Sequence, residues 1–202
     1  MIAVIDYGVG NLFSLTSSLA AIGADSVVTD DPSVIAAADK IILPGVGAFA
    51  DAKRKLSDKG LDKVIISEVK AFKKILGICL GMQMLFEKSF EYGEHDGLGL
   101  LKGSVVAMEG VIPKELKIPH IGWNALHIKK KHPIFKYVKE NDYVYFVHSY
   151  YADGCADSLL ADTEYGANLT AAVALDNISG TQFHPEKSGE VGLSILRAFA
   201  EW

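Results

Sequence analysis

Cysteine is scarce in this sequence, with only Cys79 and Cys155 among 202 residues. Two cysteines are too few for the disulfide framework that stabilises small secreted domains. The first residues, MIAVIDYG, contain neither a basic segment nor a long apolar one, unlike a secretory leader. No later run is long enough to span a bilayer. We therefore expect a cytoplasmic protein, in which a cysteine in an unusual local setting is more often reactive than structural.

A strong excess of charge of either sign is also lacking. The formal net charge is −5, and 22% of the residues are charged while 50% are apolar. This is the composition of an ordinary globular protein, and it indicates neither a nucleic-acid nor a membrane partner. The only basic cluster, at residues 129–132, ends at Pro133 and is interpreted as a solvated loop.

The motifs of the common cofactor and metal sites are missing as well. Gly8-Val9-Gly10 follows the first apolar run, but Phe13 stands where a dinucleotide fingerprint has its third glycine. The chain has no Gly-Lys-Ser/Thr phosphate loop, no paired-cysteine motif and no His-Glu-x-x-His motif. We therefore expect no cofactor and no metal.

Apolar runs and helical patterns alternate through the first half of the chain. The runs IAVI and KIIL are almost continuously apolar, as expected of strands that are covered on both faces. The alternation predicts an α/β fold with a mainly parallel central sheet and helices on both faces. The expected strands are Met1–Ile5, Ser26–Thr29, Lys40–Leu43 and Lys74–Ile78, and the expected helices are Leu12–Ile22, Pro32–Ala38 and Leu61–Phe72.

The second half contains strand-like runs with little helix between them, which predicts antiparallel additions and hairpins. The segment LDNIS between the last two runs has the residues of a hairpin turn. Since no linker, repeat or low-complexity segment interrupts the chain, we expect one domain, 1–202. The strands expected here are Ser104–Met108, Trp123–Ile128, Tyr143–Val147, Ala171–Leu175 and Ile178–Phe183, followed by a helix over Ser188–Glu201.

Cys79 lies in Gly77-Ile78-Cys79-Leu80-Gly81, between an expected parallel strand and an expected helix. Open α/β sheets bind their ligands at the carboxyl ends of such strands. A strand, a sharp turn and a helix with glycines two residues on either side form a nucleophile elbow, here with a thiol in place of the usual serine. Side chains at the glycines would collide with the strand or the helix, and the helix N-terminus would favour the thiolate. The alternative is a small buried residue in a tight turn.

His184 and Glu186 flank Pro185 at the end of the last expected strand. A residue before proline is extended, and residues i and i+2 of an extended segment share one face. The carboxylate could then orient the imidazole as a general base for Cys79. The alternative is an ion pair at a strand end. His148 is the rival base, although it has no acidic neighbour in the sequence and is expected to line the site or to pack.

Gly45-Val46-Gly47 follows Pro44 at the carboxyl end of another expected strand. Two glycines with one residue between them allow a peptide unit to turn over at low cost. Such a loop could supply one amide of an oxyanion hole, and the amide of Leu80 could supply the other. A plain turn between a strand and a helix is the alternative interpretation.

These motifs together resemble a known family. PGVGAF, GICLGMQ and FHPEK, in this order, are similar to those of the class I (triad) glutamine amidotransferases. DYGVGNL, PHIGWN, YFVHSYY and QFHPEKS further resemble the glutaminase subunits of imidazole glycerol phosphate synthases, which act in histidine biosynthesis. The resemblance extends from Asp6 to Ser188, and no catalytic position departs from the family pattern.

The resemblance implies a glutaminase with a Cys79-His184-Glu186 triad. The thiolate would attack the side-chain amide of L-glutamine, and the resulting thioester would be hydrolysed. An oxyanion hole would comprise Leu80 and the residues of the glycine loop, Gly45, Val46 and Gly47. The resemblance also implies that substrate is bound by Gln83, His148, Ser149 and Tyr150.

The resemblance further implies a partner, a cyclase subunit with a (β/α)₈ barrel, in a heterodimer through which ammonia passes directly. The cyclase would make imidazole glycerol phosphate and an aminoimidazole carboxamide ribotide. We expect the docking surface around the mouth of the active site, at Asn11, Trp123, Tyr145 and Lys187. The alternatives are the glutaminase of pyridoxal phosphate synthesis, against which PHIGWN argues, a stand-alone γ-glutamyl hydrolase, and a non-catalytic binding protein of this fold.

Overall fold

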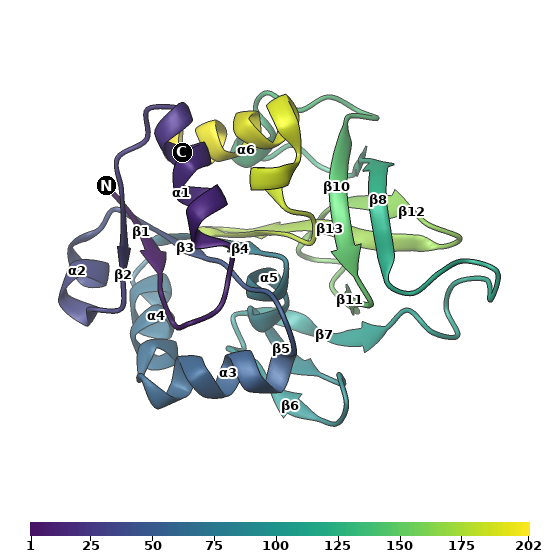
Figure 1. The fold of residues 1–202 in the computed structure, drawn as a ribbon, viewed down its shortest axis with the longest axis horizontal. Coiled ribbons are helices and arrows are strands. Elements are labelled where there is room, and N and C mark those ends of the chain that lie inside the picture. Colours follow the sequence, from purple (N-terminus) through teal and green to yellow (C-terminus); the bar gives the residue numbers. More distant parts are fainter.

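The centre of the molecule is an eight-stranded sheet (Figure 1) in a computed structural model that describes residues 1–202. The first five strands run parallel to one another, and the last three are antiparallel. The predicted fold class is therefore confirmed. The strand order across the sheet is β2 (Ser26–Thr29), β1 (Ile2–Ile5), β3 (Lys40–Leu43), β4 (Lys74–Ile78), β14 (Ile178–Thr181), β13 (Asn168–Leu175), β12 (Leu159–Glu164) and β9 (His127–Ile128).

Helices cover both faces of this sheet because the parallel strands are apolar on both sides. Ile2 and Val4 of β1 face one layer of helices, while Ala3 and Ile5 face the other. Figure 1 shows α1 and α6 on one side and α2, α3 and α4 on the opposite side. Their bounds are α1 Leu12–Ala21 and α6 Gly189–Glu201 on the first side, and α2 Pro32–Ala37, α3 Phe49–Asp58 and α4 Leu61–Lys70 on the second.

Two smaller sheets complete the strand-rich end of the molecule. One pairs β10 with β8 in antiparallel fashion, and the other has the order β11-β7-β5-β6. They lie next to the carboxyl ends of β4 and β14. The chain runs from β4 through α5 (Leu80–Met84) into β5, and the backbone N–H of His184, after β14, donates to the carbonyl of Tyr145 in β10. The bounds of the strands in these two sheets are β5 Phe86–Ser89, β6 His95–Asp96, β7 Leu101–Ala107, β8 His120–Ala125, β10 Tyr143–His148 and β11 Tyr150–Asp153.

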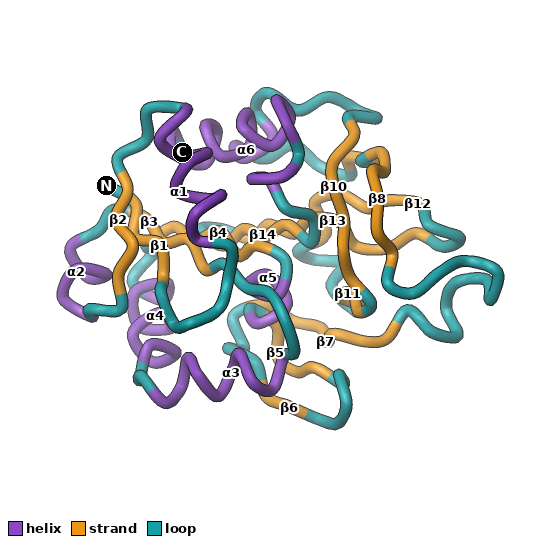
Figure 2. The backbone as a smooth tube through the Cα atoms, in the orientation of Figure 1, coloured by secondary structure: helices purple, strands orange, loops and turns teal.

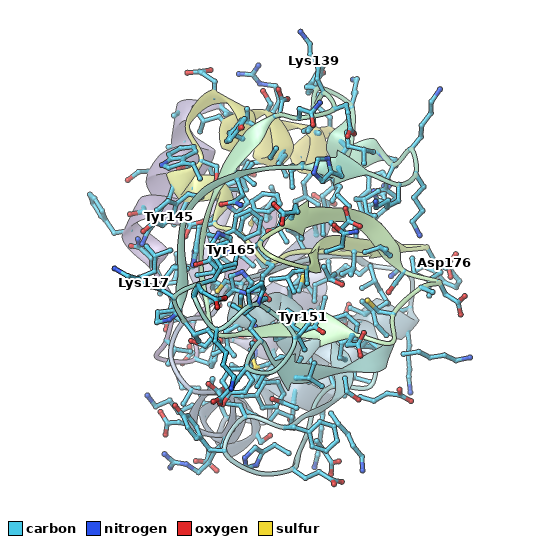
Figure 3. All side chains as sticks on the ribbon, turned by 90° about the vertical axis from the view of Figure 1, so that its right-hand side faces the viewer. Lys117, Lys139, Tyr145, Tyr151, Tyr165 and Asp176 are labelled. Carbon is cyan, nitrogen blue, oxygen red and sulfur yellow. The ribbon has the colours of Figure 1, made fainter.

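Different connections lie at the amino and the carboxyl ends of the parallel strands. The hairpin between β13 and β14 turns at Asp176 and Asn177, as LDNIS predicted, and this turn lies at the amino end of β14. Tyr145 lies on the opposite side of the view in Figure 3. The loops after β1 and β3 cross the middle of Figure 2 and touch, since a Cβ on Gly10 would lie 3.2 Å from Cβ of Pro44. The carboxyl ends of the parallel strands are therefore covered by loops that contact each other.

Several elements were missed by the sequence reading. Helix α3 has a narrow apolar stripe, with Phe49, Ala52 and Leu56 buried among charged residues. Strands β5 and β6, of sequence FEKS and HD, are short and lack apolar alternation. The expected strand Trp123–Ile128 begins earlier, as β8, and is broken at Leu126. Strands β11 and β12 were also missed, while the other predicted elements agree within a few residues at each end.

No helix in this fold has both the length and the apolar composition that crossing a membrane would require.

Candidate active site

Cys79 occupies the sharp turn between β4 and the short helix α5 (Leu80–Met84). Its backbone has φ +54° and ψ −112°, a conformation that residues with a Cβ seldom adopt. The Cys79 N–H donates a hydrogen bond of 2.7 Å to the carbonyl of Thr181, the last residue of β14. The prediction of a strained turn that bears the thiol is therefore confirmed.

Both flanking glycines are required by close approach. A Cβ on Gly81 would lie 1.8 Å from the carbonyl oxygen of Leu43, and one on Gly77 would lie 2.7 Å from the carbonyl oxygen of Gly81. The predicted collision of side chains is thus confirmed. Helix α5 has only five residues. The positive potential that was predicted at the helix N-terminus would therefore come from the unpaired first amides of this short helix.

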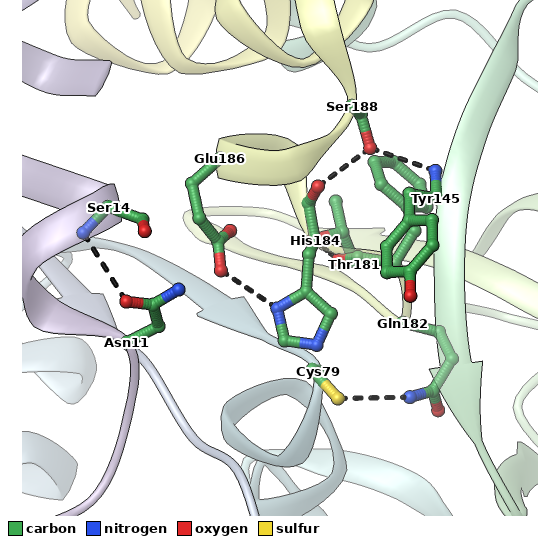
Figure 4. Close-up of polar contacts among 10 residues, drawn as sticks. Asn11, Ser14, Cys79, Tyr145, Thr181, Gln182, His184, Glu186 and Ser188 are labelled. Carbon is green, nitrogen blue, oxygen red and sulfur yellow. Dashed lines mark hydrogen bonds and ion pairs between the residues drawn. The ribbon is translucent and has the colours of Figure 1, made fainter. Parts of the chain in front are cut away.

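His184 and Glu186 form a buried pair beside Cys79 (Figure 4). Nδ1 of His184 lies 2.8 Å from Oε1 of Glu186, and the two side chains are 2% and 4% exposed. The His184 N–H donates to the carbonyl of Tyr145. The hydroxyl of Ser188 donates to the carbonyl of His184 at 2.6 Å and accepts from the Tyr145 N–H. The backbone of His184 is therefore held by β10 and by the turn, and Glu186 holds its ring.

The local geometry that joins this pair differs from the prediction. His184 is extended, but Pro185–Lys187 form a 3₁₀ turn, so the two residues do not share the face of a strand. The turn curls the carboxylate back toward Nδ1 of the preceding imidazole. The predicted contact is present, although its predicted cause was wrong.

The charges around His184 determine its protonation. Burial by itself lowers the pKa of His184, but its contacts with Cys79 and Glu186 outweigh this and raise its pKa to about 10. The ring is therefore an imidazolium at neutral pH. An imidazolium next to sulfur stabilises a thiolate and can give a proton to a leaving group.

The glycine loop lies against the elbow. A Cβ on Gly45 would come within 2.7 Å of the Gly81 nitrogen and 2.9 Å of the Tyr7 hydroxyl, so glycine is needed here for packing. The Tyr7 hydroxyl donates a buried hydrogen bond of 2.6 Å to the carbonyl of Pro44. Gly47 has φ +94° and open space around it, and Val46 is 40% exposed. The conformational freedom that was predicted for both glycines is thus greater at Gly47.

A pocket of about 260 Å³ brings these groups together. A wider groove of about 910 Å³ shares Pro119, Ser149 and Tyr150 with it and opens the pocket toward the surface. Gly45 lies behind the pocket, in a narrow crevice with Asn11 and Glu186. The lining contains the predicted residues Val46, Gly47, Cys79, Leu80, Gln83, His148, Ser149, Tyr150 and His184, and also Glu91, Pro119 and Val147.

The neutral His148 ring turns its unprotonated nitrogen, Nε2, toward His120. Its Nδ1 lies 2.9 Å from the carbonyl of Tyr150, to which it donates, and its Nε2 lies 3.1 Å from Nδ1 of His120. Burial lowers the pKa of His148 to about 4, so the ring is neutral at neutral pH. These contacts favour His184 over His148 as the base.

Two residues of the pocket region were missed in the sequence. Gln182 is fully buried, and its Nε2 lies 3.8 Å from Sγ of Cys79. Glu91 supplies the only carboxylate of the pocket lining and accepts a hydrogen bond of 2.5 Å from the Phe49 N–H. A carboxylate there can pair with the α-ammonium group of an amino-acid substrate. Gln182 begins the motif QFHPEKS, so its place in the sequence was a signal, whereas Glu91 belongs to none of the motifs.

The residues expected to bind a partner lie around this site. Trp123 is 52% exposed, and its ring packs edge-on to that of Tyr145, 5.9 Å between centroids, across the β8–β10 ladder. Lys187 is exposed at the end of the 3₁₀ turn. Asn11 is half-buried, and its Oδ1 accepts from the Ser14 N–H, which caps α1 (Figure 4). Asn11 therefore has a structural role as well.

Comparison with known proteins gives one consistent result. The family model described as "Glutamine amidotransferase class-I" matches residues 3–201. A protein named "Imidazole glycerol phosphate synthase subunit HisH" from Caldanaerobacter subterraneus subsp. tengcongensis is 52% identical over 100% of this chain and 98% of its own length. Proteins of the same name from Oceanobacillus iheyensis and Methanothermobacter thermautotrophicus are 50% and 48% identical, each over 100% of this chain and 98% of their own.

Solved structures share the fold at lower identity. A structure described as "Crystal structure of glutamine amidotransferase" has a TM-score of 0.77 and 16% identity, with 100% of both chains covered. One described as "Structure of PurLQS from Thermotoga maritima" has a TM-score of 0.74 and 21% identity, covering 99% of this chain and 97% of the other.

Proposed function

This chain belongs to the class-I glutamine amidotransferases, and we propose that it hydrolyses L-glutamine to glutamate and ammonia through a cysteinyl thioester. The observation that carries this proposal is the meeting of Cys79 with the buried His184–Glu186 pair at one pocket. The relatives of about 50% identity bear the name of a synthase subunit. The chain is accordingly the glutamine amidotransferase subunit of imidazole glycerol phosphate synthase in histidine biosynthesis.

The proposed reaction begins with the Cys79 thiolate, which attacks the side-chain carbonyl carbon of glutamine. The electron pair of the carbonyl moves to oxygen, and the N–H groups of Leu80 and the glycine loop stabilise that oxyanion. His184, as an imidazolium, protonates the amide nitrogen, and the carbon–nitrogen bond breaks to release ammonia. Water then attacks the thioester while His184 accepts its proton, and glutamate and the thiolate leave.

Several features of the pocket suit glutamine as substrate. Both protons of the Gln83 amide are engaged, by the Tyr150 carbonyl and by Gln182, so Gln83 can offer the substrate only its oxygen. We assign Ser149 and Tyr150 to the substrate-binding wall with His148, since all three line the pocket. The test of substrate choice is release of ammonia from glutamine but not from asparagine, which is one methylene shorter.

Ammonia must reach a second site, since most of it becomes non-nucleophilic ammonium in neutral water. We propose that a cyclase subunit docks over the mouth of the pocket and receives it. An apolar strip supports this docking surface: Ile121 and Trp123 of β8 and Tyr143 and Tyr145 of β10 share the outward face of one ladder. The strip leads to Val147, which lines the pocket.

The test of the proposed function is glutaminase activity of the purified chain, measured alone and then with the cognate cyclase and its ligand. We expect the unpartnered rate to be at least ~10²-fold below the stimulated rate. Without the partner, the glycine loop is expected to rest with a carbonyl, not an amide, toward the oxyanion position, and the loss of one oxyanion donor costs that much. Full turnover by the chain alone would instead favour a stand-alone hydrolase. No turnover under either condition would contradict the proposed function.

Replacing Trp123 with alanine should weaken binding of the cyclase. A large exposed ring at the centre of an interface typically contributes about 2 kcal/mol or more, or roughly 30-fold in Kd. Phe72→Ala is the matched control, since Phe72 is 76% exposed but precedes the amino end of β4. Titration calorimetry with both variants checks this, and an unchanged Kd for Trp123→Ala would remove the β8–β10 strip from the interface.

A further inference from the structure

A pair of buried glutamine side chains extends from the nucleophile into the protein interior. Gln83 and Gln182 are 6% and 0% exposed. Nε2 of Gln83 lies 3.1 Å from the carbonyl of Tyr150 and 3.0 Å from Oε1 of Gln182. Nε2 of Gln182 in turn lies 3.8 Å from Sγ of Cys79 (Figure 4). The triad described above makes no use of this pair, and the proposed substrate contact uses only the oxygen of Gln83.

The backbone carbonyl of Tyr150 determines which way the nitrogen and oxygen of each side-chain amide point. The Tyr150 carbonyl can only accept, so Gln83 must turn its nitrogen toward it. That same nitrogen donates its second proton to Gln182, which must therefore present its oxygen to Gln83. The nitrogen of Gln182 is left on the side of Cys79, where it can only donate.

We propose that Gln182 is a catalytic residue that donates a hydrogen bond to the Cys79 thiolate, and that Gln83 is a positioning residue that keeps Gln182 in this orientation. The proposal rests on the proposed glutaminase function, because it concerns the charge state of the same nucleophile.

A donor at this place favours every state in which sulfur is negative. Before attack it stabilises the thiolate relative to the thiol, together with the His184 imidazolium. In the second half of the reaction the carbon–sulfur bond breaks and its electron pair returns to sulfur. The Gln182 amide then meets an anionic leaving group, whereas in the thioester it faces a nearly neutral sulfur. In this step its interaction with sulfur is thus stronger in the transition state than in the thioester, which is the condition for accelerating hydrolysis of the thioester.

The experiment uses alkylation of Cys79 by iodoacetamide over a series of pH values, in a Cys155→Ala background so that one thiol remains. The variants are Gln182→Met, which keeps the side-chain length but has no donor, and Gln83→Met. Ser179→Ala is the matched control, because Ser179 is a buried residue of β14 whose hydroxyl bonds to the Ile75 carbonyl and not to the site. Intact-mass measurement reports the alkylated fraction.

For Gln182→Met we expect about ten-fold slower alkylation on the acid side, equivalent to a shift of the pH midpoint upward by about one unit. Gln83→Met should shift it in the same direction by less, and the double variant should match Gln182→Met alone, since Gln83 acts through Gln182. Ser179→Ala should not shift it. An unshifted midpoint for Gln182→Met overturns the proposal, and so does an equal shift for Ser179→Ala.

Thermal unfolding verifies that each variant is folded. If Gln182→Met does not fold, Gln182→Asn is used in its place, because its side chain is one methylene too short for the amide to reach the sulfur. The acid limb of the kcat/KM profile of the stimulated enzyme should move upward with the alkylation midpoint. Alkylation requires no glutamine, so the two proposals fail separately. If the wild-type complex does not hydrolyse glutamine, the proposed function is refuted. If the wild type is active but Gln182→Met is alkylated at the normal midpoint, only the proposed hydrogen bond from Gln182 to Cys79 is refuted.

Discussion

Replacing Cys79 with alanine should abolish glutamine hydrolysis, even in the presence of the cyclase and its ligand. The thiol forms the covalent intermediate, and no other thiol lines the pocket. Alanine removes a single sulfur atom, and it retains the Cβ that the backbone at φ +54° already tolerates. The fold should therefore persist. Steady-state release of ammonia and thermal unfolding of the same sample check both parts.

Cys155→Ala is the control for this result. Cys155 is also a buried free cysteine, but its sulfur lies near the hydroxyl of Thr170, at 3.5 Å, and outside the pocket. We expect its activity to be close to that of the wild type. A glutamine-mimicking electrophile should label Cys79 alone, as peptide mass spectrometry would show. Loss of activity in Cys155→Ala, with Cys79→Ala still active, would contradict the assignment of the nucleophile.

The strained turn that carries Cys79 could be predicted because the constraints on it are local. Gly77 and Gly81 indicate that strand and helix approach too closely for side chains. A Cβ on Gly81 would collide with the Leu43 carbonyl, and one on Gly77 would collide with the Gly81 carbonyl. The parallel sheet was equally predictable, since the apolar strands are continuous in sequence. Where a strand is short and charged, as in β5, its pairing depends on neighbours that the local sequence does not reveal.

The surroundings of the nucleophile depended on contacts between distant segments. Gln182 reaches Cys79 across 103 residues, and Glu91 reaches the Phe49 amide across 42. A glutamine just after a strand and a glutamate in a loop are both common, so neither residue by itself indicates a site. The conformation of the His184–Glu186 link was missed for a related reason: Ser188 and Tyr145 hold the turn, and Tyr145 belongs to another strand.

Replacing His184 should reduce the stimulated kcat by at least ~10²-fold, the usual contribution of a general acid–base group. His184→Ala also leaves the buried Glu186 carboxylate without its partner at Oε1. The other oxygen of Glu186, Oε2, has no hydrogen-bond partner even in the wild type. Unfolding free energy should fall by roughly 3–5 kcal/mol as a result. His184→Gln is therefore the better variant, because its amide N–H can still donate to Glu186. It should lose a similar factor in kcat while remaining more stable than His184→Ala.

Glu186→Gln and His148→Ala test which histidine acts as the base. Glu186→Gln keeps an oxygen that can accept from Nδ1, so it should reduce kcat less than His184→Ala. His148→Ala should mainly raise KM for glutamine, because both ring nitrogens are engaged in the pocket wall. A loss of kcat from His148→Ala equal to that from His184→Ala would reverse the assignment of the base.

The pH dependence of Glu186→Gln separates a charge effect from loss of orientation alone. Since the pKa of His184 is raised to about 10 partly by Glu186, the imidazolium should persist below this pH. The stability that it adds to the fold should be complete below the ordinary histidine pKa and be lost as pH rises from there through the folded-state pKa. Removing the carboxylate's charge lowers the pKa of His184, so the alkaline decline of kcat/KM should begin at lower pH in Glu186→Gln than in the wild type. An unchanged alkaline limb would mean that Glu186 orients the ring without holding its proton.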